Sequence, residues 1–300
     1  MAATADMIIE RRRVRRRLAF WRIVAIVAIV VAAIGFMPSF GALGEHIARV
    51  EIDGLILDDP DRERELAEIA DDRRARALIV HVNSPGGTVA ASEAVYLSLR
   101  KVAERKPVVT VMDEYAASGG YIAALAGERI VARGNTLTGS IGVVMEAPNV
   151  EGLLDKLGVE VTRIKSGPLK AEPSLTTSPS PEALQAQEAL IADTFQWFRG
   201  LVAERRKLDG AVLERVSDGR AFTGRQAVEL GLVDELGDEE TALAWLSAMH
   251  GIDRDLAVVE RNWDDADLPW PFSLVDEGAR ALAELDRLVA AGPRLYALLR

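Results

Sequence analysis

Strand-like and helix-like patterns alternate through the middle of the chain, and this alternation constrains the fold more than any other feature. Residues 76–82, RALIVHV, form a nearly continuous apolar run that is typical of a buried strand. Similar runs at 48–57 and 107–113 predict two further strands, and helical patterns cover 88–104 and 181–207. Strands that alternate with helices in this way predict an α/β domain with mostly parallel strands.

Shorter segments continue the same alternation. RIVA (129–132), IGVVME (141–146) and residues 159–164 are expected to form strands, whereas YIAALAG (121–127) and residues 150–157 are expected to form helices.

Four loops follow predicted strands and hold most of the residues that could do chemistry. In parallel α/β folds, sites form in the loops at the carboxyl ends of the strands. We therefore expect these loops to meet at one edge of the sheet. They read NSPGG (83–87), AASGG (116–120), TGSIG (138–142) and KSGPLKAEPS (165–174).

The N-terminal region joins a basic cluster, RRRVRRR, to a long apolar run. Residues 18–37 match the roughly 20 residues that a helix needs to cross a bilayer core, and Arg22 lies near their start, where its side chain can reach the interface. A cleaved signal peptide is the alternative, because the uncharged part, 23–37, also fits a signal-peptide core. The SFGALG that follows fits a cleavage site poorly, so we expect a retained anchor. The positive-inside rule then places residues 1–17 in the cytoplasm and the body across the membrane.

Composition excludes several classes of function. The net charge is −10 although seven arginines lie in the first 40 residues, so the remainder is strongly acidic and argues against a nucleic-acid partner. The absence of cysteine excludes disulfides, zinc–thiolate sites and a cysteine nucleophile. The three histidines are too scattered for a metal site. We therefore expect neither a metal nor another cofactor.

Ser118 is the candidate nucleophile. It follows a predicted strand and precedes a predicted helix, where backbone N–H groups favour developing negative charge. Gly119 and Gly120 allow the backbone to turn tightly beside it. The arrangement is similar to a nucleophile elbow, although the sequence G-x-S-x-G is absent. Taken alone, Ser-Gly-Gly is more often an N-cap at the start of a helix.

A serine nucleophile needs a base, and the distribution of lysine supplies a candidate. Only six of the 36 basic residues are lysines, and Lys165 and Lys170 both lie in the fourth loop. Arginine keeps its proton in proteins, whereas a desolvated lysine can act as general base to a serine. Ser140 could hold the lysine amine, and amides of the NSPGG glycines together with the amide of Gly119 could form an oxyanion hole. The alternatives are a solvated loop and ordinary polar turns.

Four segments in combination resemble the motifs of the signal peptide peptidase A family of membrane-anchored serine proteases. They are VNSPGG, AASGGYIAA, TGSIGVV and KSGPLKAEPS. The segment DGRAFTGRQAVELGLVDELG (218–237) resembles that family's tail segment, and the resemblance covers about 48–250. Two departures are YI in place of a tyrosine pair after the Ser-Gly-Gly, and AE after the second lysine of the fourth loop. Neither departure removes a catalytic group.

The resemblance implies a Clp protease/crotonase-like fold, a spiral of mostly parallel strands wrapped by helices and preceded by one transmembrane helix. It also implies a ring-like homo-oligomer whose sites are completed by neighbouring subunits, with Lys165 as a loop residue. The roles that it implies are nucleophile for Ser118, base for Lys170, support of the lysine for Ser140, and oxyanion donors for Gly86 and Gly119.

The expected organisation is therefore a basic cytoplasmic N-terminus, a single-pass span in a bacterial cytoplasmic (inner) membrane, and an extracytoplasmic protease domain. Its substrates would be cleaved signal peptides or other hydrophobic peptides. A crotonase-type acyl-CoA enzyme and a non-catalytic scaffold of the same fold are the alternatives. The C-terminal part predicts an aromatic-rich linker and an amphipathic helix, and the closing PRLYALLR could reach a peptide groove. The expected segments are 1–17, 18–37, 45–260 and 261–300.

Overall fold

The computed structural model describes residues 21–22, 44–261 and 296–298. It divides the chain into two units, Met1–Glu45 and His46–Arg300. In the first unit Trp21 and Arg22 are helical, and the rest of the expected span lies outside the described residues. Among the residues that are described, no helix has the length and apolar character needed to cross a bilayer. The expected C-terminal amphipathic helix also lies outside them.

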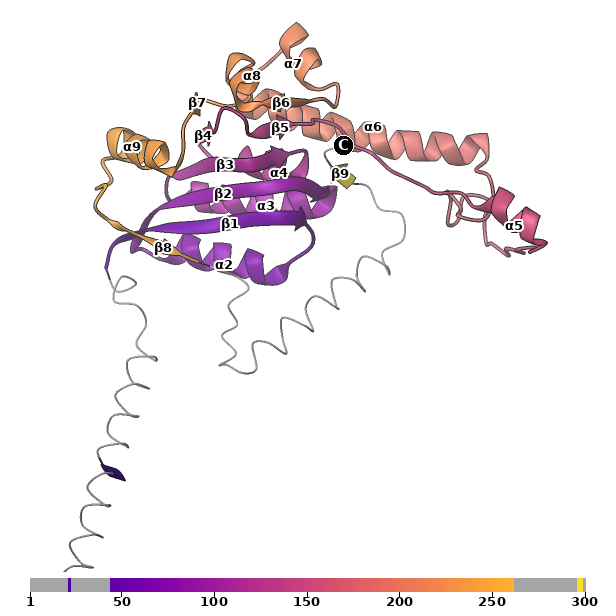
Figure 1. Cartoon of the computed structure of the whole chain (residues 1–300), viewed down its shortest axis with the longest axis horizontal. Coiled ribbons are helices and arrows are strands. Elements are labelled where there is room, and N and C mark those ends of the chain that lie inside the picture. The colour runs from indigo at the N-terminus through magenta and orange to yellow at the C-terminus, as the bar shows by residue number, and fades with distance from the viewer. Residues whose placement is uncertain (1–20, 23–43, 262–295, 299–300) are drawn as a thin grey trace, which may run out of the picture. The chain divides into compact units, whose positions relative to one another are not determined.

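A nine-stranded sheet forms the centre of the second unit (Figure 1). Its main path runs in the order β6-β5-β3-β2-β1-β8, while β4 joins β3 to β7 and β9 pairs with β2. Every pairing is parallel except β2 with β9 and β5 with β6. The predicted α/β class with mostly parallel strands is confirmed. The strands are β1 (His46–Ile56), β2 (Ala75–Thr88), β3 (Val108–Ala117), β4 (Arg129–Ala132), β5 (Leu137–Gly139), β6 (Ala221–Thr223), β7 (Glu235–Leu236), β8 (Ala257–Glu260) and β9 (Tyr296–Leu298).

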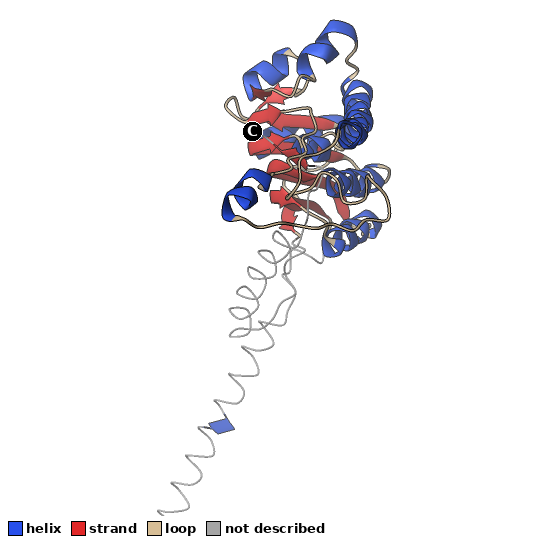
Figure 2. Ribbon diagram, turned by 90° about the vertical axis from the view of Figure 1, so that its right-hand side faces the viewer, coloured by secondary structure: helices blue, strands red, loops and turns tan. Residues whose placement is uncertain are grey.

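Helices cover the sheet, and in the perpendicular view most of them gather along one side of the strand layer (Figure 2). The larger core joins the sheet to α2, α3, α4 and α6, and a smaller core joins it to α9. In α3, Val95, Leu99 and Val102 fall on one face and are fully buried; burial of each contributes roughly 1.5–3 kcal/mol. The helices are α2 (Pro60–Asp71), α3 (Val89–Ala103), α4 (Gly119–Ala124), α5 (Glu151–Leu157), α6 (Pro181–Arg206), α7 (Gly210–Val216), α8 (Gly224–Glu229) and α9 (Glu239–His250).

The NSPGG loop is a correction to the sequence-based prediction. The sequence predicts a Gly-rich turn after the strand, but β2 continues through it to Thr88. The segment pairs with β1, where Leu55 lies opposite Gly86, after a register shift in β1 between Asp53 and Leu55. The glycines therefore lie on the edge of a strand, where their backbone can meet another chain segment.

Residues 142–180 form an arm, which carries α5 away from the sheet (Figure 1). The strands expected at 141–146 and 159–164 are wrong for the single chain, because neither segment forms a strand apart from an isolated bridge at Val144. Both segments have strand-like sequences but lie beyond the strands of their own sheet. The helices expected at 150–157 and 181–207 are confirmed as α5 and α6.

Candidate active site

Ser118 stands alone between the end of β3 and the start of α4. Its backbone has φ 55° and ψ −116°, a conformation of type II′ turns that favours glycine and strains other residues. Its side chain makes no capping hydrogen bond to the helix. The Oγ is buried and has no hydrogen-bond partner within the described part of the chain. These features fit a nucleophile elbow and not a side-chain N-cap.

Gly119 brings α4 against the edge of β2. A Cβ at this position would lie 2.3 Å from Ser92 Oγ and 3.0 Å from the backbone nitrogen of Gly87. Only glycine fits without movement of these neighbours. Because Gly119 is the first residue of α4, its N–H lies among those that the helix itself cannot satisfy, and such groups bind negative charge.

The second proposed oxyanion donor, Gly86, is engaged in this structure. Its N–H donates to Ser84 Oγ at 3.1 Å. An oxyanion role for Gly86 therefore requires that this bond opens. The backbone nitrogen of Gly87 lies closer to Gly119, and the sequence pattern did not distinguish these two neighbouring glycines.

Ser140 lies next to the elbow through backbone pairing. Ala117 of β3 lies opposite Gly139 of β5, and the N–H of Ser118 donates to the carbonyl of Gly139 at 2.8 Å. Ser140 follows directly, is buried and has φ 49°. Three of the four predicted loops therefore meet at the carboxyl ends of β2, β3 and β5.

The fourth loop does not reach this point within the chain. Lys170 is exposed, lies on the arm between α5 and α6, and does not bond Ser118. Lys165 donates to the carbonyl of Pro168 at 3.0 Å and forms an ion pair with Glu172. The hydrogen bond from Lys165 lowers the pKa of the Glu172 carboxyl. These two contacts hold the side chain of Lys165 within the loop.

Two other side chains that could act as a base are occupied. Tyr121 is buried and donates its hydroxyl to the carbonyl of Leu232 at 2.8 Å, and burial raises the pKa of this phenol. His81 lies 2.9 Å from Asp113 through Nδ1 and 2.7 Å from Glu239 through Nε2. Neither ring nitrogen of His81 is available to accept a proton from a serine.

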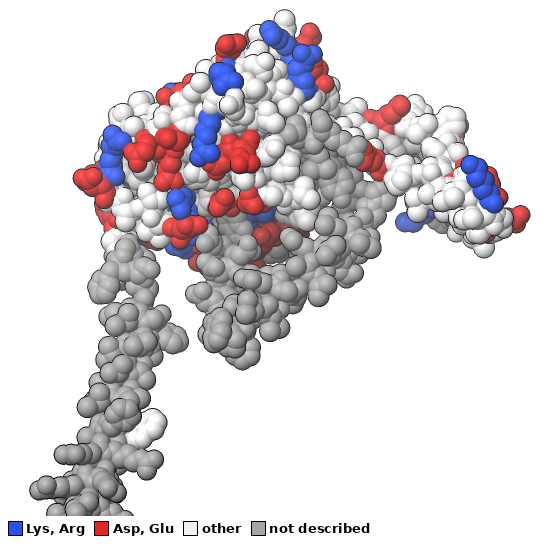
Figure 3. Space-filling model, in the orientation of Figure 1, with Lys and Arg blue, Asp and Glu red and all other residues white. Residues whose placement is uncertain are grey.

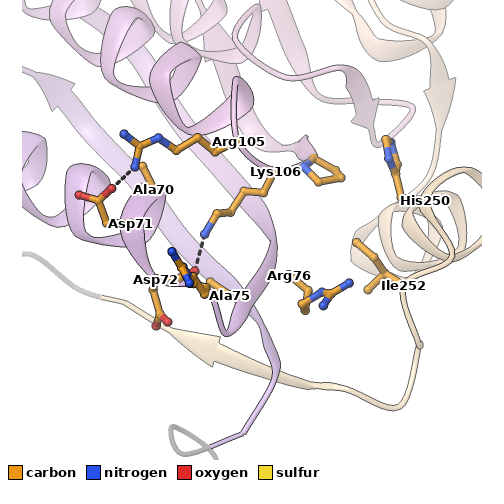
Figure 4. A pocket seen from close by; sticks show the side chains of 11 residues that line it. Ala70, Asp71, Asp72, Ala75, Arg76, Arg105, Lys106, His250 and Ile252 are labelled. Atoms are coloured by element: carbon orange, nitrogen blue, oxygen red, sulfur yellow. Dashed lines mark hydrogen bonds and ion pairs between the residues drawn. The ribbon is translucent and has the colours of Figure 1, made fainter.

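A cavity of about 640 Å³ lies at the opposite end of the strands (Figure 4). It is lined at the start of β2 by Ala75 and just before β3 by Lys106 and Pro107. Lys106 is buried, and its amine donates to the carbonyls of Ile69 at 2.5 Å and Asp72 at 2.7 Å. Burial lowers the pKa of Lys106. This buried lysine satisfies the end of α2, at the edge of the sheet away from Ser118.

Strand β9 lies on the edge of β2 beside the elbow. It belongs to the closing segment PRLYALLR, for which the sequence suggests only that it could reach a peptide groove. Its backbone runs antiparallel to β2, with Leu298 opposite Gly86 and Tyr296 opposite Thr88. β9 also contacts α4. The chain thus pairs one of its own segments along the NSPGG edge, in the way that an extended peptide adds to a sheet.

The model of peptidase family S49 matches residues 100–253, about half of the chain. This chain belongs to peptidase family S49. It is a serine-type peptidase, and the resemblance to the signal peptide peptidase A family is confirmed. The matched region includes Ser118, Ser140 and Lys170, whereas Gly86 lies before it.

Several relatives of this S49 peptidase carry protease names. A protein of Synechocystis named as a protease is 40% identical over 212 residues, which are 70% of this chain and 76% of that protein. A protein of Enterococcus faecium named signal peptide peptidase SppA is 34% identical over 68% of this chain and 63% of its own. Protease 4 of Salmonella typhi is 40% identical over 58% of this chain but only 28% of its own length.

Among solved structures, a mutant of ClpP1 from Listeria monocytogenes matches 63% of this S49 peptidase and 91% of its own chain. The sequence identity is 18% and the TM-score is 0.44. The Clp-like spiral expected from the sequence stays a prediction.

Proposed function

We propose that this S49 peptidase is a membrane-anchored endopeptidase that cleaves hydrophobic peptides such as spent signal peptides, with Ser118 as nucleophile and Lys170 as general base. The observation that carries the proposal is the strained backbone of Ser118 around a buried hydroxyl without a partner among the described residues. Strain of this kind persists where the surrounding fold enforces it, and it concentrates at catalytic positions. The apolar run at 18–37 supports attachment to a membrane.

Lys170 would come from a neighbouring copy of the chain. The arm exposes many large apolar side chains, and Ile164 is 97% and Leu157 66% exposed. Much of the arm's visible surface is neither acidic nor basic (Figure 3). An exposed apolar surface of this kind is typical of an interface, and residues 159–164 have a strand-like sequence without a strand partner in the described chain. A second copy would cover the arm and bring Lys170 to Ser118, in a ring-like assembly.

Burial at that interface would favour the neutral amine of Lys170, because desolvation disfavours the charged ammonium. The neutral amine takes the proton of Ser118 as Oγ attacks the carbonyl carbon of the peptide. The N–H of Gly119 and a second amide from the Gly86–Gly87 pair receive the oxyanion. The protonated Lys170 gives its proton to the leaving amine, and an acyl-enzyme remains.

Hydrolysis of the acyl-enzyme repeats these steps with water. Lys170 takes a proton from water, which attacks the ester, and the proton then returns to Ser118 as the acid product leaves. Ser140, beside the elbow, would hold the lysine amine. The pairing of β9 along β2 supports this edge as the place where an extended peptide lies across Ser118.

The deciding experiment is hydrolysis of hydrophobic peptides by the full chain in detergent, compared with Ser118→Ala and Lys170→Ala. We expect both variants to lose activity and to keep the wild-type circular dichroism spectrum. A serine-directed phosphonate should label wild-type Ser118 and leave Ser118→Ala unlabelled. Unchanged hydrolysis by Lys170→Ala would remove the dyad, and a wild type that cleaves no peptide would leave a scaffold as the better interpretation.

A further inference from the structure

A cavity of about 610 Å³ opens between the start of α3 and the middle of α6, and the proposed mechanism does not use it. Its lining combines an apolar part, with Val89 and Trp197, and an acidic part, with Glu93 and Asp193. The two carboxylates come from different helices, so the fold itself brings them to one cavity.

The chemistry of this lining selects a cation. Within residues 44–261, neither Glu93 nor Asp193 forms an ion pair with a basic side chain. Trp197 is half-buried and packs against the main core. An aromatic face and unpaired carboxylates both attract a lysine or arginine head group, and the apolar wall accepts its methylene stem.

The cavity lies at the end of the edge on which β9 is paired. β2 ends at Thr88, which also lines the cavity, and α3 begins at the next residue. A peptide paired in the register of β9 places one residue opposite Gly86, beside the elbow, and the second residue before it opposite Thr88. A peptide that reaches Ser118 along this edge therefore passes the mouth of the cavity.

We infer that this cavity is a specificity subsite for a lysine or arginine side chain in the peptide. The cavity would accept the side chain of the peptide residue opposite Thr88. If the residue opposite Gly86 is the first residue before the cleaved bond, the residue opposite Thr88 is the third. This inference rests on the proposed function, because it needs a peptide bound along β2. It adds a cationic requirement to a substrate that is otherwise hydrophobic.

Matched peptides test the subsite in the full chain. Lysine, its neutral near-isostere methionine, and glutamate are placed in turn at the second, third and fourth residues before the cleaved bond, which is mapped by mass spectrometry. We expect kcat/KM to favour lysine over methionine by about tenfold at the third residue only. A preference at another position, or none, overturns the inference.

Variants then assign the preference to the cavity. Glu93→Gln combined with Asp193→Asn removes both charges and keeps the side-chain shapes, and it should bring the lysine-to-methionine ratio close to one. Glu188→Gln, which removes an exposed carboxylate earlier on the same helix α6, should leave the ratio as in the wild type. An unchanged ratio in the double variant overturns the subsite.

A binding measurement separates the subsite from the catalytic proposal. The Ser118→Ala variant should bind the lysine peptide about tenfold more tightly than the methionine peptide, and the lysine peptide should change the fluorescence of Trp197, with Trp197→Phe as the reference. Equal binding of the two peptides overturns the subsite even if both are cleaved. Selective binding without any cleavage by the wild type supports the subsite and overturns the peptidase mechanism.

Discussion

The backbone N–H of Ser118 donates to the carbonyl oxygen of Gly139 at 2.8 Å, and this bond joins the end of β3 to the end of β5. Ser140 follows Gly139, so the two serines lie at the same edge because two strands are paired. The Ser118 side chain takes no part in holding this arrangement, since its Oγ has no partner within the described residues. The fold therefore positions the nucleophile through its backbone alone.

This arrangement predicts that the elbow stores strain. Ser118→Gly relieves the positive φ, whereas Ser118→Ala keeps it and removes only the hydroxyl. We expect Ser118→Gly to have a free energy of unfolding about 1 kcal/mol above that of Ser118→Ala, with both variants inactive. Urea unfolding of the two variants, followed by tryptophan fluorescence, measures the difference. Equal midpoints would mean that the elbow is not strained.

The contact between α4 and β2 predicts a coupled pair of substitutions. Gly119→Ala places a Cβ 2.3 Å from Ser92 Oγ, so we expect a loss of about 1–3 kcal/mol in stability together with activity. Ser92→Ala removes that oxygen but leaves the backbone nitrogen of Gly87 at 3.0 Å. The double variant should therefore be more stable than the sum of the single changes predicts, and remain poorly active. Strict additivity in a double-mutant cycle would contradict this contact.

His81 predicts a dependence of stability on pH. Burial alone would lower the pKa of His81, but its hydrogen bonds to Asp113 and Glu239 and their charges outweigh burial and raise it. Arg133 lies 3.4 Å from Asp113 and Arg49 lies 3.4 Å from Glu239, so each of these carboxylates also has a basic partner.

Because the folded-state pKa is raised, the stabilisation by His81 is complete below its unfolded pKa of about 6.5 and is lost as pH rises through the folded value. The difference in unfolding free energy between wild type and His81→Gln should therefore shrink from pH 6 to pH 9. Urea unfolding at intervals across this range measures the difference. A gap that widens with pH would show that the ring is neutral when folded.

Local patterns in the sequence were sufficient for the central strands, α3, α6 and the placement of three motif segments at the carboxyl ends of the strands. The signals for these elements, continuous apolar runs and a Pro at the start of α6, are local, so each can be recognised from a few neighbouring residues. The helix α2 was missed because its sequence, PDRERELAEIAD, is mostly charged and buries few side chains. The continuation of β2 through NSPGG was missed because a Pro-Gly pair usually marks a turn, and here pairing with β1 overrides that preference.

Neither the sequence nor the fold of a single chain places Lys170 beside Ser118. A strand pattern such as that of 159–164 indicates that a segment can pair, but it does not indicate which strand is its partner. The buried lysine that the base hypothesis needs is absent from the arm within the described residues, where Lys170 is exposed. Under the proposed mechanism, completion of the site would depend on contacts between copies, which local patterns do not encode.

The exposed arm predicts that assembly depends on its apolar residues. Ile164→Asp places a charge at a side chain that is 97% exposed in the single chain, so folding of the chain itself should be unaffected. Burial of that charge in an interface is costly, and we expect a smaller assembly by light scattering together with reduced hydrolysis. Met249→Asp, at a position 66% exposed on α9, is the control outside the arm. An unchanged assembly size in Ile164→Asp would exclude the arm from the interface.

Mixing two inactive variants tests whether Ser118 and Lys170 act from different chains. Ser118→Ala keeps the lysine and Lys170→Ala keeps the serine, so a mixed assembly restores a complete pair wherever one variant donates to the other. At equal amounts, about a quarter of the sites in a ring should recover activity if subunits mix at random.

The control mixture pairs Ser118→Ala with the double variant Ser118→Ala/Lys170→Ala, which can form no complete pair and should stay inactive. Both mixtures are dissociated and reassembled in the same detergent before hydrolysis is measured, because recovery needs exchange of subunits. Exchange itself is monitored by energy transfer between labelled chains. Full exchange without recovered hydrolysis would place the catalytic pair within one chain and require the arm to fold back onto its own elbow.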